Sequence, residues 1–171
     1  MTSHVPITIR PLEAGDRARW AALLTAHGRT YGRNLNAATL NAVWSWLVDD
    51  QTPLRALVAD HAADGVIGIV QYQFAYRALA GCMACQLSDL HVELAWRGHG
   101  IGRRLIEGVR AAARDNGCAV VRWLGRESNH AARRLYDSLD ARTDFVQYEL
   151  AVADGAIRRN RPPARRGRRR A

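Results

Sequence analysis

A glycine-rich turn is the feature of this sequence that points most directly to chemistry. Glycines at positions 98, 100 and 102 lie between the apolar stretch Leu87–Val92 and a helical pattern that begins near Ile101. A strand that passes through such a turn into a helix exposes unpaired backbone N–H groups at the positive end of the helix dipole. Arg97 and Arg103 add positive charge beside the turn. The pattern predicts a binding site for a phosphorylated small molecule.

Two well-known phosphate-binding loops do not fit this turn. A Walker A loop ends in Gly-Lys-Ser or Gly-Lys-Thr, and this chain contains no lysine, since all its basic side chains other than histidine are arginine. The dinucleotide-binding fingerprint requires a third glycine three positions after the second, and that position is Arg103. The first loop is therefore excluded, and the second is disfavoured.

The elements that would position this turn can be traced along the chain. The residue patterns predict strands at 7–10, 54–59, 66–76, 83–92, 119–124 and 145–151. They predict helices after Asp16, at 37–48, from Ile101 to a stop at Gly117, and at 129–139. The order β-α-α-β-β-β-α-β-α-β predicts an α/β domain with a mixed central sheet, because a hairpin-built half precedes helix-connected crossovers.

Length and charge divide the chain into one domain and a tail. A chain of 171 residues is most simply a single domain. The net charge is +9, but eight of the 25 arginines fall within residues 155–171, which leaves 17 arginines against 16 acids elsewhere. We therefore expect a domain over residues 1–154 and a disordered tail over residues 155–171. The charge of the tail suits contact with RNA, DNA or another polyanion.

Neither the start of the chain nor its cysteines indicate a membrane-spanning segment or a metal site. The first residues form neither a basic leader nor an apolar run, and no stretch approaches the roughly 18 apolar residues of a membrane span. We expect a soluble, cytoplasmic protein. Cys82 and Cys85 form a Cys-x-x-Cys pair, but zinc needs two further ligands at compatible spacing, and redox pairs of this kind usually open a helix. We interpret these cysteines as small buried or half-buried residues.

Two motifs of the chain belong together. The first is the glycine turn, Arg-x-x-Gly-x-Gly, here Arg97 to Gly102, and the second lies in the predicted helix at 129–139 as Asn129, Ala132, Leu135 and Tyr136. They resemble the two signatures of the GNAT superfamily of N-acetyltransferases. Similarity extends over Leu87–Leu150, and the earlier half agrees in the order of its elements. The resemblance implies a single GNAT-like domain with a splayed central sheet. It also implies acetyl-CoA as the acetyl donor and no metal, and homodimers are common among similar proteins.

The resemblance also implies roles for individual residues. It places the coenzyme A pyrophosphate on the backbone of the turn, formed by Arg97, Gly98, His99, Gly100, Ile101, Gly102 and Arg103. It places the pantetheine arm beside Asn129 and the coenzyme A sulfur opposite the hydroxyl of Tyr136. Where the fourth strand splays from the fifth, backbone N–H groups near Leu90, His91 and Val92 become free to bind the acetyl carbonyl.

Acyl transfer to an amine needs a proton donor for the departing thiolate and a proton acceptor for the amine. Tyr136 is our candidate acid, because a phenol with a pKa of about 10 can protonate a thiolate whose conjugate acid lies near 8 to 9. Asp89 is our first candidate base, and Glu127 is the second. Alternation places Asp89 and His91 on one face of their strand, and Leu90 on the other. His91 is either a core-edge histidine or a participant.

The sequence leaves the acceptor and two other functions open. Asp89 to Val92, followed by the glycine turn, looks most like the branch that acetylates diamines, polyamines or histone-type lysines. Many members of the polyamine branch carry Glu-Asp where this chain has Ser88-Asp89. The sequence therefore identifies the acceptor only as a primary amine. The alternatives are a non-catalytic acyl-CoA-binding module and a nucleic-acid- or ribosome-associated protein that acts through the arginine-rich tail.

Overall fold

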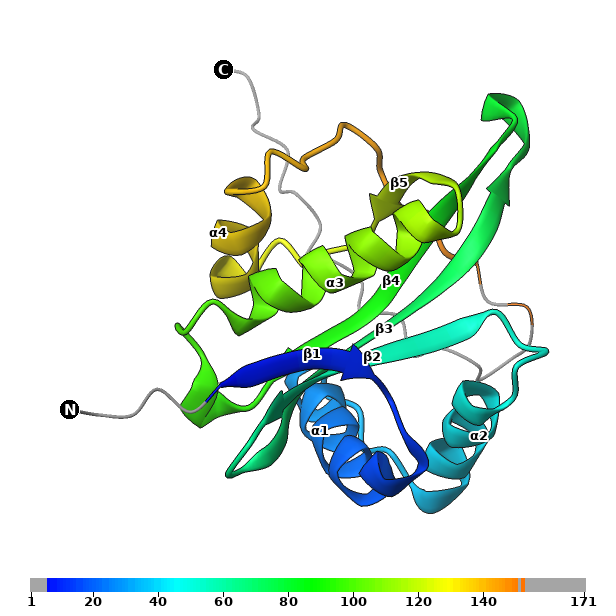
Figure 1. The fold of residues 1–171 in the computed structure, drawn as a ribbon. Helices are drawn as coiled ribbons and strands as arrows, with labels where there is room; N and C mark the ends of the chain where they lie inside the picture. The colour runs from blue at the N-terminus through cyan, green and yellow to red at the C-terminus, as the bar shows by residue number, and fades with distance from the viewer. Residues whose placement is uncertain (1–5, 151, 153–171) are drawn as a thin grey trace.

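A computed structural model describes residues 6–150 and 152 of the chain (Figure 1). Five strands form one sheet in the order β1-β2-β3-β4-β5, with bounds Ile7–Pro11, Leu54–His61, Gly65–Arg77, Cys82–Val92 and Cys118–Arg122. The helices are α1 Arg17–Thr30, α2 Ala37–Val48, α3 Ile101–Asp115 and α4 His130–Asp137. Neighbouring strands from β1 to β4 are antiparallel, and β4 pairs with β5 in parallel. The predicted mixed α/β sheet is therefore confirmed.

Helices cover both faces of the sheet, with α1 and α2 on one face and α3 and α4 on the other (Figure 1). The predicted apolar stripe of α3 is buried against the sheet, since Ile101, Leu105 and Val109 are at most 1% exposed. On the opposite face, Trp20 of α1 packs against Trp44 of α2, with ring centroids 5.1 Å apart. These two clusters fix α1 and α3 on opposite sides of β3 and β4.

The last predicted strand, over 145–151, is not part of the sheet. Residues 141–150 have no regular secondary structure, and Phe145 and Tyr148 are 87% and 90% exposed. Ala151 lies outside the described residues. Alternation of apolar and polar residues can produce a strand only where a neighbouring strand supplies hydrogen bonds and a packing surface. This segment has neither in the described part of the chain, so the order of elements ends with α4.

Some expectations fall on parts of the chain that the structure does not describe. The arginine-rich tail, 155–171, and the domain boundary at 154 lie outside the described residues. Within residues 6–150 and 152, no helix combines the length and the hydropathy that crossing a membrane requires.

A bulge in β4 determines which of its side chains face which helix. Gln71 of β3 pairs with Asp89, but the next residue, Tyr72, pairs with Leu87, so Ser88 is an extra residue in β4. Leu87 and Leu90 therefore both pack in the cluster under α3. Asp89 turns to the opposite face, toward α1, as the alternation over residues 89–92 predicts.

Asp16 connects the start of α1 to β1. The sequence predicts this residue as a helix cap, but its carboxylate accepts two hydrogen bonds from the Arg10 guanidinium, at 2.7 and 2.9 Å, and none from the N–H groups of α1. It also accepts one from the N–H of Glu13, at 2.8 Å. The Arg10 guanidinium, and then this N–H, lower the pKa of Asp16 below its usual value of 3.8.

We expect Asp16→Asn to lower the free energy of unfolding at neutral pH by about 1–3 kcal/mol, because hydrogen bonds to a charged group are lost. A carboxylate with a lowered pKa stabilises the folded state above its unfolded-state pKa, and this contribution disappears as the pH falls through the folded-state pKa. Urea unfolding of both proteins from neutral to acid pH measures the difference. Glu107→Gln removes an exposed carboxylate paired with Arg110 at 3.3 Å and is the control. A difference between wild type and Asp16→Asn that stays constant into the acid range would contradict the assignment.

Candidate active site

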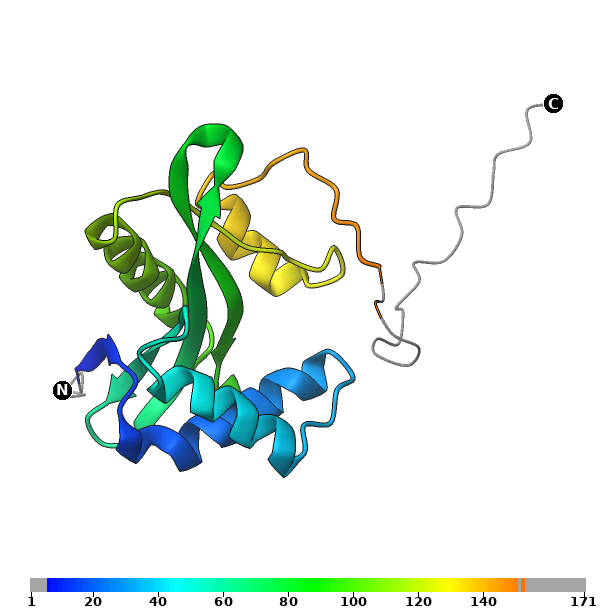
Figure 2. The same cartoon turned by 90° about the vertical axis from the view of Figure 1, so that its right-hand side faces the viewer.

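A cavity of about 770 Å³ lies between the end of α1, the C-terminal half of β4, the glycine turn and the segment that joins β5 to α4. In Figure 2 the C-terminal end of α1 and the segment before α4 lie on opposite sides of this region. The cavity is bounded by residues that are far apart in the sequence, from His27 on α1 to Tyr136 on α4. The sheet and both helical layers therefore contribute to one site.

The cavity exists because β4 and β5 separate. Their parallel pairing covers only Met83 to Gln86 on β4, matched to Cys118 to Arg122 on β5. Beyond Gln86, β4 has no partner on that side among the described residues, and Leu87, Leu90 and Val92 line the cavity instead. Backbone polar groups along this stretch of β4 can therefore bind a ligand.

The glycine turn lies at one end of the cavity. Gly98 and Gly100 have φ angles of 83° and 75°, a left-handed conformation that residues with a Cβ adopt only at a cost. The first backbone hydrogen bond of α3 runs from the N–H of Arg104 to the carbonyl of Gly100. The N–H groups of residues 101–103 consequently have no backbone partner in the described structure, and they can bind an anion.

The third glycine of the motif has a different role. A Cβ built on Gly102 would lie 3.1 Å from Cδ2 of Leu135, so α4 rests directly on the first turn of α3. Arg103 strengthens this contact, because its Nη2 donates to Oγ of Ser138 at 2.7 Å. Arg97 ties the turn to β4 by donating from Nε to the carbonyl of Val92 at 3.0 Å. The turn is thus held in shape by its neighbours.

Tyr136 lines the cavity opposite β4, and its ring packs edge-on against Trp123, with centroids 5.4 Å apart. Gly125 leaves room for this ring, since a Cβ there would lie 3.2 Å from Cε2 of Tyr136. Burial, and secondly the neighbouring Tyr31, raise the pKa of Tyr136 above its usual value of 10. The phenol is therefore protonated at neutral pH and can donate a proton to an anion formed in the cavity.

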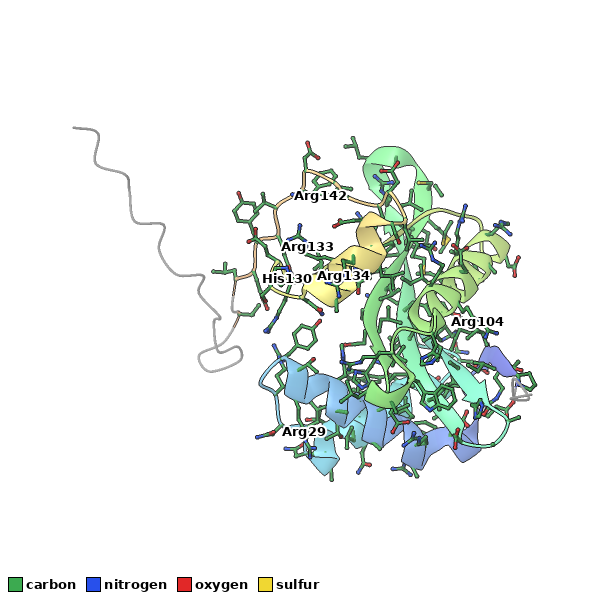
Figure 3. The ribbon with its side chains drawn as sticks, turned by 90° about the vertical axis from the view of Figure 1, so that its left-hand side faces the viewer. Arg29, Arg104, His130, Arg133, Arg134 and Arg142 are labelled. Carbon is green, nitrogen blue, oxygen red and sulfur yellow. The ribbon has the colours of Figure 1, made fainter. Side chains whose placement is uncertain are left out.

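Four arginines line the cavity: Arg97, Arg103, Arg126 and Arg134. Figure 3 shows where Arg29 lies on α1 and where His130, Arg133 and Arg134 lie on α4. Arg134 lines the cavity itself. Asn129 begins α4, where its Oδ1 accepts from the N–H of Ala132 at 3.2 Å, and it also lines the cavity. The positive charge of the arginines therefore favours an anionic ligand in the cavity.

Most of the predicted site residues line this one cavity: Leu90, His91, Val92, Arg97, Gly98, Gly100, Ile101, Gly102, Arg103, Asn129 and Tyr136. His99 does not, because its Nδ1 lies 3.0 Å from the carbonyl oxygen of Arg97 and its ring packs against Trp96. Asp89 and Glu127 are also not among the lining residues. Glu127 is exposed, and its backbone carbonyl accepts from Nη1 of Arg133 at 3.2 Å.

The sequence did not identify the contribution of α1 to the cavity. His27 and Tyr31 line it, and so does Arg126, whose Cζ lies 4.4 Å from the centroid of the Tyr31 ring. A signal was present, because His27 and Tyr31 continue the helical stripe begun by Trp20. The sequence alone did not show that this stripe runs from the core into a cavity.

Two buried groups have strongly shifted pKa values. Burial, then His27 and Arg97, lower the pKa of His91 to about 4, so this imidazole is neutral at neutral pH. Burial, then Cys118, raises the pKa of the Cys85 thiol to about 12, which makes it a poor nucleophile. Within the described part of the chain, no group of three His, Cys, Asp or Glu side chains could hold a metal ion.

Comparison with known proteins gives consistent matches. The model of the Acetyltransferase (GNAT) family matches residues 20–140. The D-amino-acid N-acetyltransferase HPA3 of Saccharomyces cerevisiae is 26% identical over 144 residues, which are 84% of this chain and 89% of that protein. The thialysine N-epsilon-acetyltransferase of Bos taurus is 35% identical over 84 residues, 49% of this chain and 48% of that protein. The chain thus matches about half the length of that second relative.

A solved structure has the same fold. The aminoglycoside N-acetyltransferase AAC(6')-Iy, in complex with CoA, superimposes with a TM-score of 0.75 and 18% sequence identity, covering 90% of this chain and 99% of that one.

Proposed function

Because this chain belongs to the Acetyltransferase (GNAT) family, we propose that it transfers the acetyl group of acetyl-CoA to a primary amine bound in the cavity beside β4. It is an acetyltransferase, and acetyl-CoA is its acetyl donor. One observation supports placing the reaction in this cavity: the glycine turn at the start of α3, which can bind an anion, and the protonated phenol of Tyr136 both line it. A donor with its phosphates at the turn can extend along β4 toward Tyr136.

In the proposed reaction the amine attacks the thioester carbonyl directly. Backbone N–H groups of β4 from Leu90 to Val92 stabilise the oxyanion, because the separation from β5 leaves that edge without a strand partner. Tyr136 then donates its proton to the departing thiolate. We assign the removal of the amine proton to the side of the cleft that holds Asp89, because Asp89 lies beside His27, which lines the cavity, whereas Glu127 is exposed.

The acceptor is proposed to be a small amine, a polyamine or a protein amine. Two of the relatives are named for amino-acid acceptors, a D-amino acid and thialysine. Arg126 lines the cavity and has no carboxylate partner among the described residues, so it is available to a carboxylate on the acceptor. We therefore include free amino acids, together with polyamines and lysine peptides, among the amines to be tested as acceptors.

The experiment that tests the proposed function measures the release of free thiol from acetyl-CoA in the presence of each member of an amine panel. The panel contains polyamines, lysine, D-amino acids, amino-acid amides, aminoglycosides, and peptides with a free lysine or N-terminus. We expect amine-dependent thiol release with at least one class, together with the N-acetylated product. Stabilisation of the protein by acetyl-CoA without thiol release for any amine would favour the non-catalytic acyl-CoA-binding module.

We also propose that the arginine-rich tail contacts a polyanion and that the enzyme acts as a homodimer. Counterion release predicts an affinity for RNA that falls steeply with salt and is lost when residues 155–171 are deleted. Electrophoretic mobility shifts over a salt series measure this, with the deletion variant as the control. Equal binding by both proteins, or none at low salt, would contradict the role of the tail. Analytical ultracentrifugation tests the dimer.

A further inference from the structure

A chain of polar contacts crosses the sheet face under α1 and ends at an imidazole in the cavity wall. Nε1 of Trp20 donates to Oε1 of Gln71 at 2.9 Å, and Nε2 of Gln71 donates to Oδ2 of Asp89 at 3.0 Å. The other carboxylate oxygen of Asp89, Oδ1, lies 3.5 Å from Nε2 of His27. Trp20 and Gln71 are buried, so the position of the carboxylate is fixed from inside the protein.

His27, and not Asp89, is the member of this pair that lines the cavity. One oxygen of Asp89 is bonded to the Gln71 amide, and the other faces the imidazole. A carboxylate so placed orients the ring. The pair therefore couples a fixed negative charge to a proton acceptor that can meet a bound ligand.

Among the ionisable groups in this part of the cavity wall, His27 is the one best placed to accept a proton. Asp89 and His91 face it from β4, and Tyr31, the residue that follows α1, also faces it, with the His91 and Tyr31 ring centroids 5.4 and 5.0 Å from its own. His91 resists protonation, as its lowered pKa shows.

We propose that His27 is the general base of the acetyl transfer and that Asp89 is a positioning residue that acts through it. The inference rests on the proposed function. As the amine nitrogen forms its bond to the acetyl carbon, it loses a proton to His27. The carbon–sulfur bond then breaks, and the thiolate takes the proton of Tyr136. Proton return from His27 to Tyr136 through solvent restores both groups, so an amine and acetyl-CoA give an N-acetyl amine and free coenzyme A.

The test compares three variants with the wild type, using the amine that the panel identifies, and a fourth variant, His27→Ala, serves for chemical rescue. His27→Gln keeps a polar side chain beside Asp89 but cannot accept a proton, and Asp89→Asn keeps the shape of the positioning residue without its charge. His61→Gln is the matched control, because His61 also pairs with a carboxylate, Asp64, at 2.8 Å, and does not line the cavity. Thermal stabilisation by acetyl-CoA verifies that each variant keeps a folded donor site.

We expect His27→Gln to lower kcat by about 100-fold and Asp89→Asn by about tenfold, with acetyl-CoA affinity within about twofold of wild type. We also expect added imidazole to restore part of the activity of His27→Ala. A purely structural role of His27 would not give this rescue.

Two outcomes would overturn the proposal. One is a His27→Gln variant with a kcat near that of the wild type. The other is an Asp89→Asn variant more damaged than His27→Gln, which would make Asp89 the direct base. Both require an active wild type, so they are distinct from a failure of the proposed function, in which the wild type itself transfers no acetyl group.

Discussion

Replacement of Tyr136 by phenylalanine is expected to lower kcat by about 100-fold or more, because the departing thiolate loses its proton donor. The affinity for acetyl-CoA should stay within about twofold, since the ring and its packing against Trp123 remain. The pKa of Tyr136 is raised by burial, so the wild-type phenol keeps its proton through neutral pH and activity should not fall until the pH exceeds the usual value of about 10. Steady-state kinetics and titration of acetyl-CoA by calorimetry measure the two quantities.

The matched control for this variant is Tyr72→Phe. Tyr72 is also buried, and burial also raises its pKa, but it packs in the core under α3 and does not line the cavity. Its loss of a hydroxyl should leave kcat near the wild-type value. A Tyr136→Phe variant with an unchanged kcat would remove Tyr136 from the mechanism, whatever the control does.

Replacement of Gly100 by valine is expected to weaken acetyl-CoA binding by about tenfold or more. The φ of 75° at this position costs about 1–2 kcal/mol for a residue with a Cβ, and relief of that strain would move the free N–H groups at the start of α3. Calorimetric titration with acetyl-CoA measures the affinity, and the thermal shift at a fixed ligand concentration provides a second measurement.

Gly117→Val is the matched control, because it places the same strain at the other end of α3. Gly117 has a φ of 67° and, like Gly100, has no heavy atom within 4 Å of a built Cβ, but it is remote from the cavity lining. Both variants should lose stability to a similar extent, and only Gly100→Val should lose affinity for acetyl-CoA. An equal loss of affinity in both would mean that the turn does not bind the donor directly.

The parts of the site that depend only on residues close together in the chain could be predicted from the sequence. The conformation of residues 98–102 depends on glycines at fixed spacing and on the helix that follows, and both are visible in the chain. The hairpin of β2 and β3 was equally visible, through Asp64 and Gly65. The alternation of residues from Asp89 onward predicted which face of β4 is polar. It did not predict the bulge at Ser88, which places Leu87 on the same face as Leu90.

The parts that depend on tertiary contacts could not be predicted. His27 reaches the cavity because α1 packs across β3 and β4, and its own helix carries no signal that distinguishes a core position from a cavity wall. Asp89 was visible as a carboxylate, but its contacts with Gln71 and His27 join three elements. The alternation over 145–151 predicted a strand, but its described residues, 145–150, are not in the sheet, because pairing depends on a partner that sequence pattern alone does not supply.

A single-turnover experiment tests most directly the claim that acetyl transfer in this cavity is direct. Protein in excess is mixed with acetyl-CoA labelled in the acetyl group and with the best amine, and the label is followed in the amine and on the protein. We predict that labelled N-acetyl amine appears at the rate of thiol release, that no acetylated protein accumulates, and that both rates fall together in Tyr136→Phe. Thiol release that precedes the amine product, with the label held on the protein, would contradict direct transfer.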